Sequence, residues 1–215
     1  MVTDYIKPSV YKKIYQIMEY ENALALRTSL ETGMRIGDVL ALTPEQIDGR
    51  TITYTAQKTG KSAKKVISAD LAKRLKRISD KKFVFVGRFG DKPRTRQTVW
   101  KDVKKATKHL KITENVGCHS ARKTYAVDVF HEKGIPSVQK ELQHTHGDTT
   151  LIYAFADMFT AQRQGGATQD AIEVERLAVA VATEVVRQLE QMFCIDESGH
   201  LRYNEKKTDE GSENG

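Results

Sequence analysis

Along the first two thirds of the chain, the apolar positions follow mostly helical spacing. Apolar residues recur every three or four positions, which places them on one face of an α-helix. Proline and glycine separate these runs, as at Thr43-Pro44 and Gly134-Ile135-Pro136, because neither favours a helix interior. The helices predicted in this way cover residues 8–32, 36–42, 69–78, 95–110, 120–133, 136–143 and 149–158. The helix over 95–110 is expected to carry Trp100 and Val103 on one side and lysines on the other.

One short region has the composition of strands instead. Residues 51–56 are rich in threonine, isoleucine and tyrosine, and residues 64–68 form a second short strand candidate. The segment between them contains Gly60 and two lysines, which predicts a β-hairpin with a basic tip. The expected fold class is therefore α+β, mainly helical, with a small β-hairpin on one side.

The last quarter of the chain has a different organisation. We expect one domain over residues 1–163 and a linker over 164–167, where two glycines follow each other. Residues 168–193 have apolar positions every three or four residues and predict an amphipathic helix. The polar residues 194–215 predict a disordered tail.

Composition narrows the class of protein. Hydrophobic residues make up 39% of the 215, enough for a packed core. No run approaches the ~18 apolar residues of a membrane-spanning helix, and the N-terminus is no apolar signal segment. Two cysteines, Cys118 and Cys194, are too few for a disulfide framework or a structural zinc site. We therefore expect a cytoplasmic protein with no membrane partner.

Charge is concentrated in the middle of the chain. The overall charge is +7, but residues 58–111 alone carry 19 Lys/Arg against 4 Asp/Glu, a net charge of +15. Residues 1–57 carry −1 and residues 112–215 carry −7. Such a block indicates a polyanion partner, most plausibly nucleic acid, although a solvated face with a basic loop would look similar.

Six side chains carry candidate chemistry, although each alone has an ordinary structural interpretation. Arg35 could simply pair with Asp38, and Tyr153 could be a core residue of an amphipathic helix. His144 and His146 could form a surface loop or half of a metal site. In chain order, the six are Arg35, Lys58, His119, Arg122, His144 and Tyr153.

Together, these six side chains suit one phosphate group. Two guanidiniums offer planar donor forks to its oxygens, and imidazoles donate hydrogen bonds and move protons. A phenol is an oxygen nucleophile when a base and positive neighbours assist it. The set includes no carboxylate cluster for Mg²⁺ and no glycine-rich nucleotide loop, so we expect neither a metal nor a cofactor.

Four segments resemble the motif boxes of the tyrosine recombinases, the phage-integrase-like site-specific recombinases. Residues 30–42 (LETGMRIGDVLAL), followed by Asp48, resemble the first arginine box, and residues 57–61 (QKTGK) resemble the hairpin lysine region. Residues 119–124 (HSARKT) resemble the His-x-x-Arg box, and residues 142–153 (LQHTHGDTTLIY) resemble the closing box. The resemblance runs from about residue 10 to 158 and includes the C-terminal helix.

Three features depart from the family pattern. Gln143 replaces the usual glycine before the second histidine, and Ala121 replaces the usual leucine before the second arginine. The chain starts almost at the catalytic domain, without the family's N-terminal core-binding domain. We interpret it as a fragment or as a minimal member.

The resemblance implies a mechanism and partners. Tyr153 would attack a DNA phosphodiester and form a 3′-phosphotyrosyl bond, while Lys58 protonates the leaving 5′-oxygen. His119 would accept the tyrosine proton, and the two arginines and His144 would hold the phosphate. The partners would be double-stranded DNA carrying a recombination site and further copies of the chain, from dimer to tetramer. Lys61 is the competing candidate for the role of Lys58.

Two points stay open from the sequence. The helix over 168–193 could pack on its own domain or dock on a neighbouring protomer, as in family members. The fold could also serve a DNA-binding module without recombination activity, or a type IB topoisomerase-like enzyme. Beyond the six catalytic candidates, the cations expected to contact DNA are Lys61, Lys64, Arg94, Arg96, Lys101 and Lys123.

Overall fold

The computed structural model describes residues 3–79, 82–88, 90, 92–143, 156–157, 160, 193–195 and 201–203. The chain divides into two compact units, residues 1–166 and 167–215. The predicted linker and all but the last residue of the helix predicted over 168–193 lie outside the described residues. So does most of the predicted helix over 149–158.

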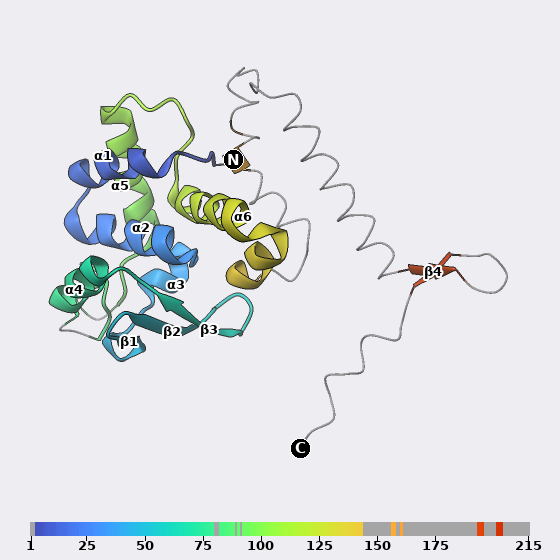
Figure 1. Ribbon diagram of the computed structural model, residues 1–215. Helices are drawn as coiled ribbons and strands as arrows, with labels where there is room; N and C mark the ends of the chain where they lie inside the picture. The colour runs from blue at the N-terminus through green and yellow to red at the C-terminus, as the bar shows by residue number, and fades with distance from the viewer. Residues whose placement is uncertain are drawn as a thin grey trace. The chain divides into compact units, whose positions relative to one another are not determined.

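Within the described residues, the first unit consists of helices and one small antiparallel sheet (Figure 1). The mainly helical α+β class predicted from the sequence is confirmed. Its elements are α1 (Pro8–Ile17), α2 (Tyr20–Thr32), α3 (Ile36–Leu40), the 3₁₀ turn η1 (Pro44–Gln46), β1 (Ile47–Asp48), β2 (Thr51–Thr55), β3 (Ser62–Val66), α4 (Ala69–Ile78), α5 (Arg96–His109) and α6 (Cys118–Leu142).

The single helix predicted over 8–32 is wrong, because the chain breaks between α1 and α2. Met18 is extended, with φ −74° and ψ 154°. The Asp102 carboxylate of α5 accepts hydrogen bonds of 2.8 Å from the Glu19 backbone N–H and from the Asn22 side chain. An acceptor at a helix N-terminus satisfies N–H groups that the helix itself leaves free. The break therefore depends on a residue more than 80 positions away.

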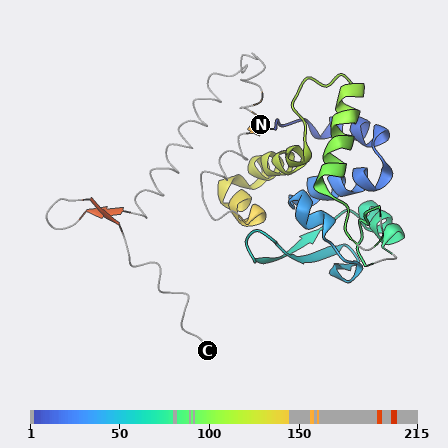
Figure 2. The same ribbon diagram turned by 180° about the vertical axis from the view of Figure 1, so that it is seen from behind.

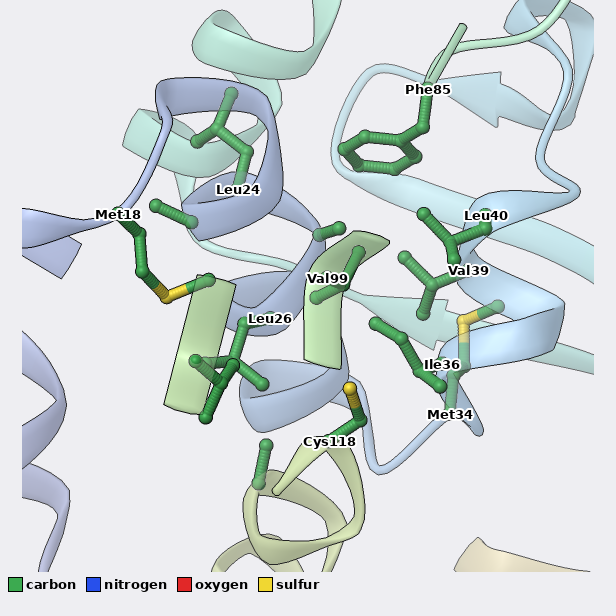
Figure 3. Packing of buried hydrophobic residues seen from close by; sticks show 14 of the residues in the cluster. Met18, Leu24, Leu26, Met34, Ile36, Val39, Leu40, Phe85, Val99 and Cys118 are labelled. Carbon is green, nitrogen blue, oxygen red and sulfur yellow. The ribbon is translucent and has the colours of Figure 1, made fainter. Parts of the chain in front are cut away.

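The core surrounds α2, as the close view in Figure 3 shows. Leu24 and Leu26 are almost completely buried, and α2 packs against α1, α4, α5 and α6. Val39 of α3 and Val99 of α5 complete the packing beside them. Because α2 is covered on several sides, close packing fixes its position. The helices packed on α2 are thereby held in place, including the helix ends that carry the candidate site.

The sheet has the strand order β1-β2-β3, with antiparallel neighbours. Thr51 pairs with Val66 and Thr55 pairs with Ser62, so β2 and β3 form the predicted hairpin. Ile52 and Tyr54 face the core, while Thr53 and Thr55 face solvent. This alternation is the period of two expected of a half-buried strand. The basic tip of the hairpin follows β2.

Helix α5 agrees closely with the predicted range, but its buried face is different. The sequence places Trp100 and Val103 on the apolar side, whereas Trp100 is 47% exposed. The buried apolar positions are Val99, Val103 and Ala106, spaced by four and three residues. The large aromatic side chain therefore lies at the surface.

Helix α6 contains the two helices predicted from the sequence, joined at a kink. Gly134 has φ 75° and ψ 178°, outside the helical region, and Pro136 follows it. Glycine adopts a positive φ without steric cost, and proline removes a backbone donor, so both predicted breaks act at this point. Neither α6 nor any other described helix is long and apolar enough to span a membrane.

In the second unit, residues 193–195 (β4) and 201–203 (β5) form a two-stranded antiparallel hairpin. The sequence predicts a disordered tail over 194–215, so these two strands are a difference from that prediction. Each strand contains two β-prone or aliphatic residues, and the segment between them contains Gly199. This local pattern is short, which is why the overall polarity of the tail conceals it.

Candidate active site

The first arginine is positioned by the end of α2. Gly33 has φ 69° and closes the helix in the left-handed conformation. A Cβ at this position would lie 2.4 Å from Cδ1 of Tyr125, so glycine also permits the close approach of α6. The next turn is fixed by the Ser29 hydroxyl, which donates to the Met34 carbonyl at 2.7 Å. Arg35 then occupies the N-cap position of α3 and is half-buried.

The hairpin lysine is held near Arg35 through Asp38. One carboxylate oxygen of Asp38 accepts a 3.0 Å hydrogen bond from the backbone N–H of Gln57. The tip turns tightly beyond it, because the Gly60 N–H donates to the Ala56 carbonyl at 2.8 Å. Lys58 is exposed on this turn. Asp38 therefore ties the hairpin to α3 instead of forming the simple ion pair with Arg35 that the sequence also allowed.

The second arginine is a buried cross-link. Arg122 is 3% exposed, and its guanidinium donates to the backbone carbonyl of Gly33 and, at 2.8 Å, to that of Leu142. These two carbonyls belong to the end of α2 and the end of α6. A charged donor in a buried position forms stronger hydrogen bonds than a neutral one. Arg122 thus joins the first arginine box to the start of the closing box.

Three of the six catalytic candidates line one cleft of about 380 Å³. Arg35, Lys58 and His119 come from three separate segments of the chain, and Lys61 is not among the lining residues. Arg122 lies nearby, since its charge influences the pKa of His119. The other two candidates, His144 and Tyr153, lie outside the described residues.

The positive charges around the cleft affect the pKa of His119. Its pKa is lowered, first by desolvation and then by the charges of Arg122 and Arg96, with Arg35 contributing further. A lowered pKa keeps the imidazole neutral at neutral pH. A neutral imidazole can accept a proton, whereas an imidazolium cannot.

Arg96 is the third cation that lines the same cleft, beside Arg35 and Lys58. It is the first residue of α5, it is exposed, and its Cδ lies 3.6 Å from the position of a Cβ on Gly37. A second depression of about 530 Å³ shares Arg96 and His119 with the first and continues to Trp100. The concave surface therefore extends along the start of α5.

The six cations expected to contact DNA fall into two groups. Arg96, Lys61, Lys64 and Lys101 are exposed. Arg94, in contrast, is engaged by Glu19 at 2.7 Å and by Glu21, and its side chain is only 12% exposed. Lys123 is 7% exposed and donates to the Thr3 carbonyl. The contacts of Arg94 and Lys123 are structural and no longer support the expectation of a DNA contact.

Two residues of the site region were not among the sequence candidates. Asp38 lies inside the first arginine box, and an acidic residue on the buried side of a short helix is a signal that could have identified it. Lys65 has no such signal, because it follows Lys64 in a basic strand. Only the structure distinguishes them, with Lys64 exposed and Lys65 buried against α6.

Comparison with known proteins gives the same fold. The XerA recombinase matches with 22% identity and a TM-score of 0.60, covering 76% of this chain and 66% of that one. The lambda integrase dimer bound to a COC′ core site matches with 20% identity and a TM-score of 0.62, covering 74% and 49%. The catalytic domain of bacteriophage HP1 integrase matches with 20% identity and a TM-score of 0.56, covering 75% and 95%.

The matches cover different shares of the known proteins. The chain spans 66% of the XerA chain and 49% of the lambda integrase chain, but 95% of the isolated HP1 catalytic domain. No curated protein matches the sequence. The family model described as "Phage integrase family" matches residues 4–158, well over half of the chain and all four motif boxes. The resemblance seen in the sequence is confirmed, and this chain belongs to the phage integrase family.

Proposed function

We propose that the chain is the catalytic domain of a tyrosine-type site-specific DNA recombinase. The observation that supports this most is the convergence of Arg35, Lys58 and His119 on one cleft, with Arg122 fixed beneath the same motifs. This group offers donors for phosphate oxygens, an acid and a proton acceptor, as a transesterification at phosphorus requires. The proposed activity takes place on DNA in the cytoplasm.

The proposed reaction balances without an external reagent. The phenolic oxygen of Tyr153 forms a bond to phosphorus, the bond between phosphorus and the 5′-oxygen breaks, and a 3′-phosphotyrosyl link results. His119 accepts the tyrosine proton, and Lys58 gives a proton to the leaving oxygen. Arg35 and Arg122 stabilise the charge on the non-bridging oxygens, and His144 supports the same phosphate. A 5′-hydroxyl from a second strand reverses the step.

The partners follow from the same proposal. Lambda integrase was solved as a dimer on a core site, and XerH was solved on a palindromic difH substrate. By likeness, we infer that this chain acts on double-stranded DNA as a dimer or tetramer. Arg96, Lys61, Lys64 and Lys101 provide exposed charge for the phosphates around the site.

A trapping experiment tests the proposed function. The protein is mixed with a library of nicked duplexes that have randomised cores, so that cleavage releases a short fragment and prevents religation. We expect an SDS-resistant protein–DNA adduct in which the DNA is joined through its 3′ end and the released fragment carries a 5′-hydroxyl. Absence of an adduct, or a link through the 5′ end, would contradict the proposal. The duplex enriched in the adduct then serves as substrate in the experiments below.

The lowered pKa of His119 predicts the pH dependence of cleavage. The neutral imidazole is the proton acceptor, so the single-turnover rate should fall as the pH drops through that pKa, which lies below 6.5. Above it the rate should level off. His119→Ala should lose this acidic limb and cleave about 10²-fold more slowly. The exposed His109 lies at the other end of α5, and His109→Ala should keep the wild-type profile.

The salt dependence of DNA binding should distinguish Arg96, the first residue of α5, from Arg94, which precedes this helix. Arg96→Ala should reduce the slope of log affinity against log salt by about one, as loss of one phosphate contact does. Arg94→Ala should leave the slope unchanged and lower the melting temperature instead, because Glu19 and Glu21 lose their partner. Fluorescence anisotropy with the trapped duplex measures both slopes. Equal slopes for Arg96→Ala and wild type would exclude Arg96 from the DNA contact.

A further inference from the structure

Two residues at the end of α6, Glu141 and Gln143, hold it against the β-hairpin. Lys65 of β3 donates to the backbone carbonyl of Glu141 at 2.7 Å and forms an ion pair with its carboxylate. Gln143 donates through its side-chain amide to the Ser62 carbonyl at 3.2 Å. Leu142, between them, accepts the hydrogen bond from Arg122. Figures 1 and 2 both show the hairpin tip beside this end of α6.

On the β3 side, the contact is made by a buried lysine. Lys65 is only 7% exposed, and its ammonium lies 5.5 Å from the centre of the Tyr125 ring. The Tyr125 hydroxyl donates to the same Glu141 carboxylate at 3.1 Å. An ion pair with a second hydrogen bond and an aromatic neighbour has a defined geometry. The hairpin is therefore held firmly on its β3 side.

Gln143 is the unusual member of this contact. It has φ 53° and ψ 40°, a left-handed conformation that favours glycine. Glycine is also the residue that the family pattern has here. In this conformation the Gln143 side chain reaches the Ser62 carbonyl, a contact that glycine could not make.

The consequence concerns the segment that carries Lys58. Asp38 holds its first residue, Gln57, and Gln143 holds its last, Ser62. Ser62 also pairs with Thr55 across the hairpin, so the contact with Gln143 fixes the paired end of the loop relative to α6 and narrows the positions open to the loop side chains. His144 follows Gln143 directly in the sequence. One contact therefore links the hairpin lysine to the start of the closing box.

We propose that Gln143, supported by the Lys65–Glu141 ion pair, is a positioning residue that places Lys58 for protonation of the leaving 5′-oxygen. This inference rests on the proposed function, because it assigns a task to the same cleft. Gln143 touches neither the DNA nor the reacting atoms in this scheme. It acts through the hairpin alone.

A change of leaving atom isolates this role. In the natural reaction the 5′-oxygen takes a proton as its bond to phosphorus breaks. With sulfur in that bridging position, the leaving group departs as a thiolate and takes none, because a thiol has a pKa of about 8.5. A defect that acts through the acid should therefore disappear on the sulfur substrate, whereas a defect in folding or in the phosphate clamp should remain.

The test compares single-turnover cleavage of the oxygen and sulfur forms of the trapped duplex. Lys58→Ala should cleave the oxygen form at least about 10²-fold more slowly and recover on sulfur. Gln143→Gly removes the hydrogen bond while suiting the backbone conformation, so folding is preserved. We expect it to be about tenfold slower on oxygen and close to wild type on sulfur. Glu141→Gln should show the same pattern more weakly.

A control variant and two further outcomes test the positioning role of Gln143. Glu132→Gln, an exposed change on the same helix, should behave like wild type on both forms. Wild-type cleavage of the oxygen form by Gln143→Gly, or equal slowing on both forms, would overturn the positioning role and leave the proposed function standing. If wild type forms no adduct with either form, the proposed function fails and the positioning role fails with it.

Discussion

Replacing Arg122 with alanine should abolish detectable DNA cleavage and destabilise the fold at the same time. The catalytic loss should be about 10³-fold or more, because the phosphate loses a donor worth roughly 10²–10³-fold and the motifs around it lose their link. The free energy of unfolding should fall by roughly 2–4 kcal/mol, since two buried carbonyls, those of Gly33 and Leu142, lose a charged donor. Single-turnover cleavage and urea unfolding measure the two effects.

Arg35→Ala is the matched comparison for this prediction. Arg35 lines the cleft, and its side chain makes no hydrogen bond or ion pair with the described residues. Its removal should slow cleavage by about 10²–10³-fold and change the free energy of unfolding by less than about 1 kcal/mol. If Arg122→Ala proved as stable as Arg35→Ala, the cross-linking role of Arg122 would be wrong.

Among substitutions that add a single methyl group, Gly33→Ala should be the most destabilising in this part of the molecule. The left-handed backbone costs a non-glycine residue about 1–2 kcal/mol, and the new Cβ would lie 2.4 Å from the Tyr125 ring. Relieving that overlap costs roughly a further 1–3 kcal/mol, giving about 2–5 kcal/mol in total. Because Arg35 follows two residues later, cleavage should be lost as well. Urea unfolding and adduct formation provide the two readouts.

Gly49→Ala separates backbone strain from the steric overlap. Gly49 has φ 54°, but no atom lies within 4 Å of a Cβ built there. It should therefore lose only about 1–2 kcal/mol and keep its cleavage activity. Equal destabilisation by the two alanine variants would contradict the packing of α6 against the end of α2.

The predictions made from the sequence succeed where the signal is local. The helix predicted over 69–78 is observed over the same residues, because Ser68 caps it, accepting from Leu71, and Leu71 and Leu75 form its buried face. The hairpin and its basic tip are also local patterns, and so are the motif boxes. Each box is a contiguous run, so recognising it requires no knowledge of the tertiary structure.

The predictions fail where a residue distant in the sequence determines the local structure. The break between α1 and α2 depends on Asp102, which periodicity within 8–32 cannot reveal. Trp100 looks apolar in composition, yet the faces of α5 are set by what packs on Val99 and Val103. The departure at Gln143 is visible in the sequence, but its bond to Ser62 spans 81 positions. The convergence of Arg35, Lys58 and His119 on one cleft likewise depends on the tertiary structure.

The described part of the chain assembles four of the six proposed catalytic side chains, and the nucleophile is the remaining claim to test directly. Trypsin cleavage after Lys140 and Arg163 would release residues 141–163, a peptide with one tyrosine, Tyr153. After adduct formation and nuclease digestion, mass spectrometry should find the nucleotide remnant on this peptide. Tyr153→Phe should form no adduct. A remnant on any other residue, or an adduct with Tyr153→Phe, would contradict the account.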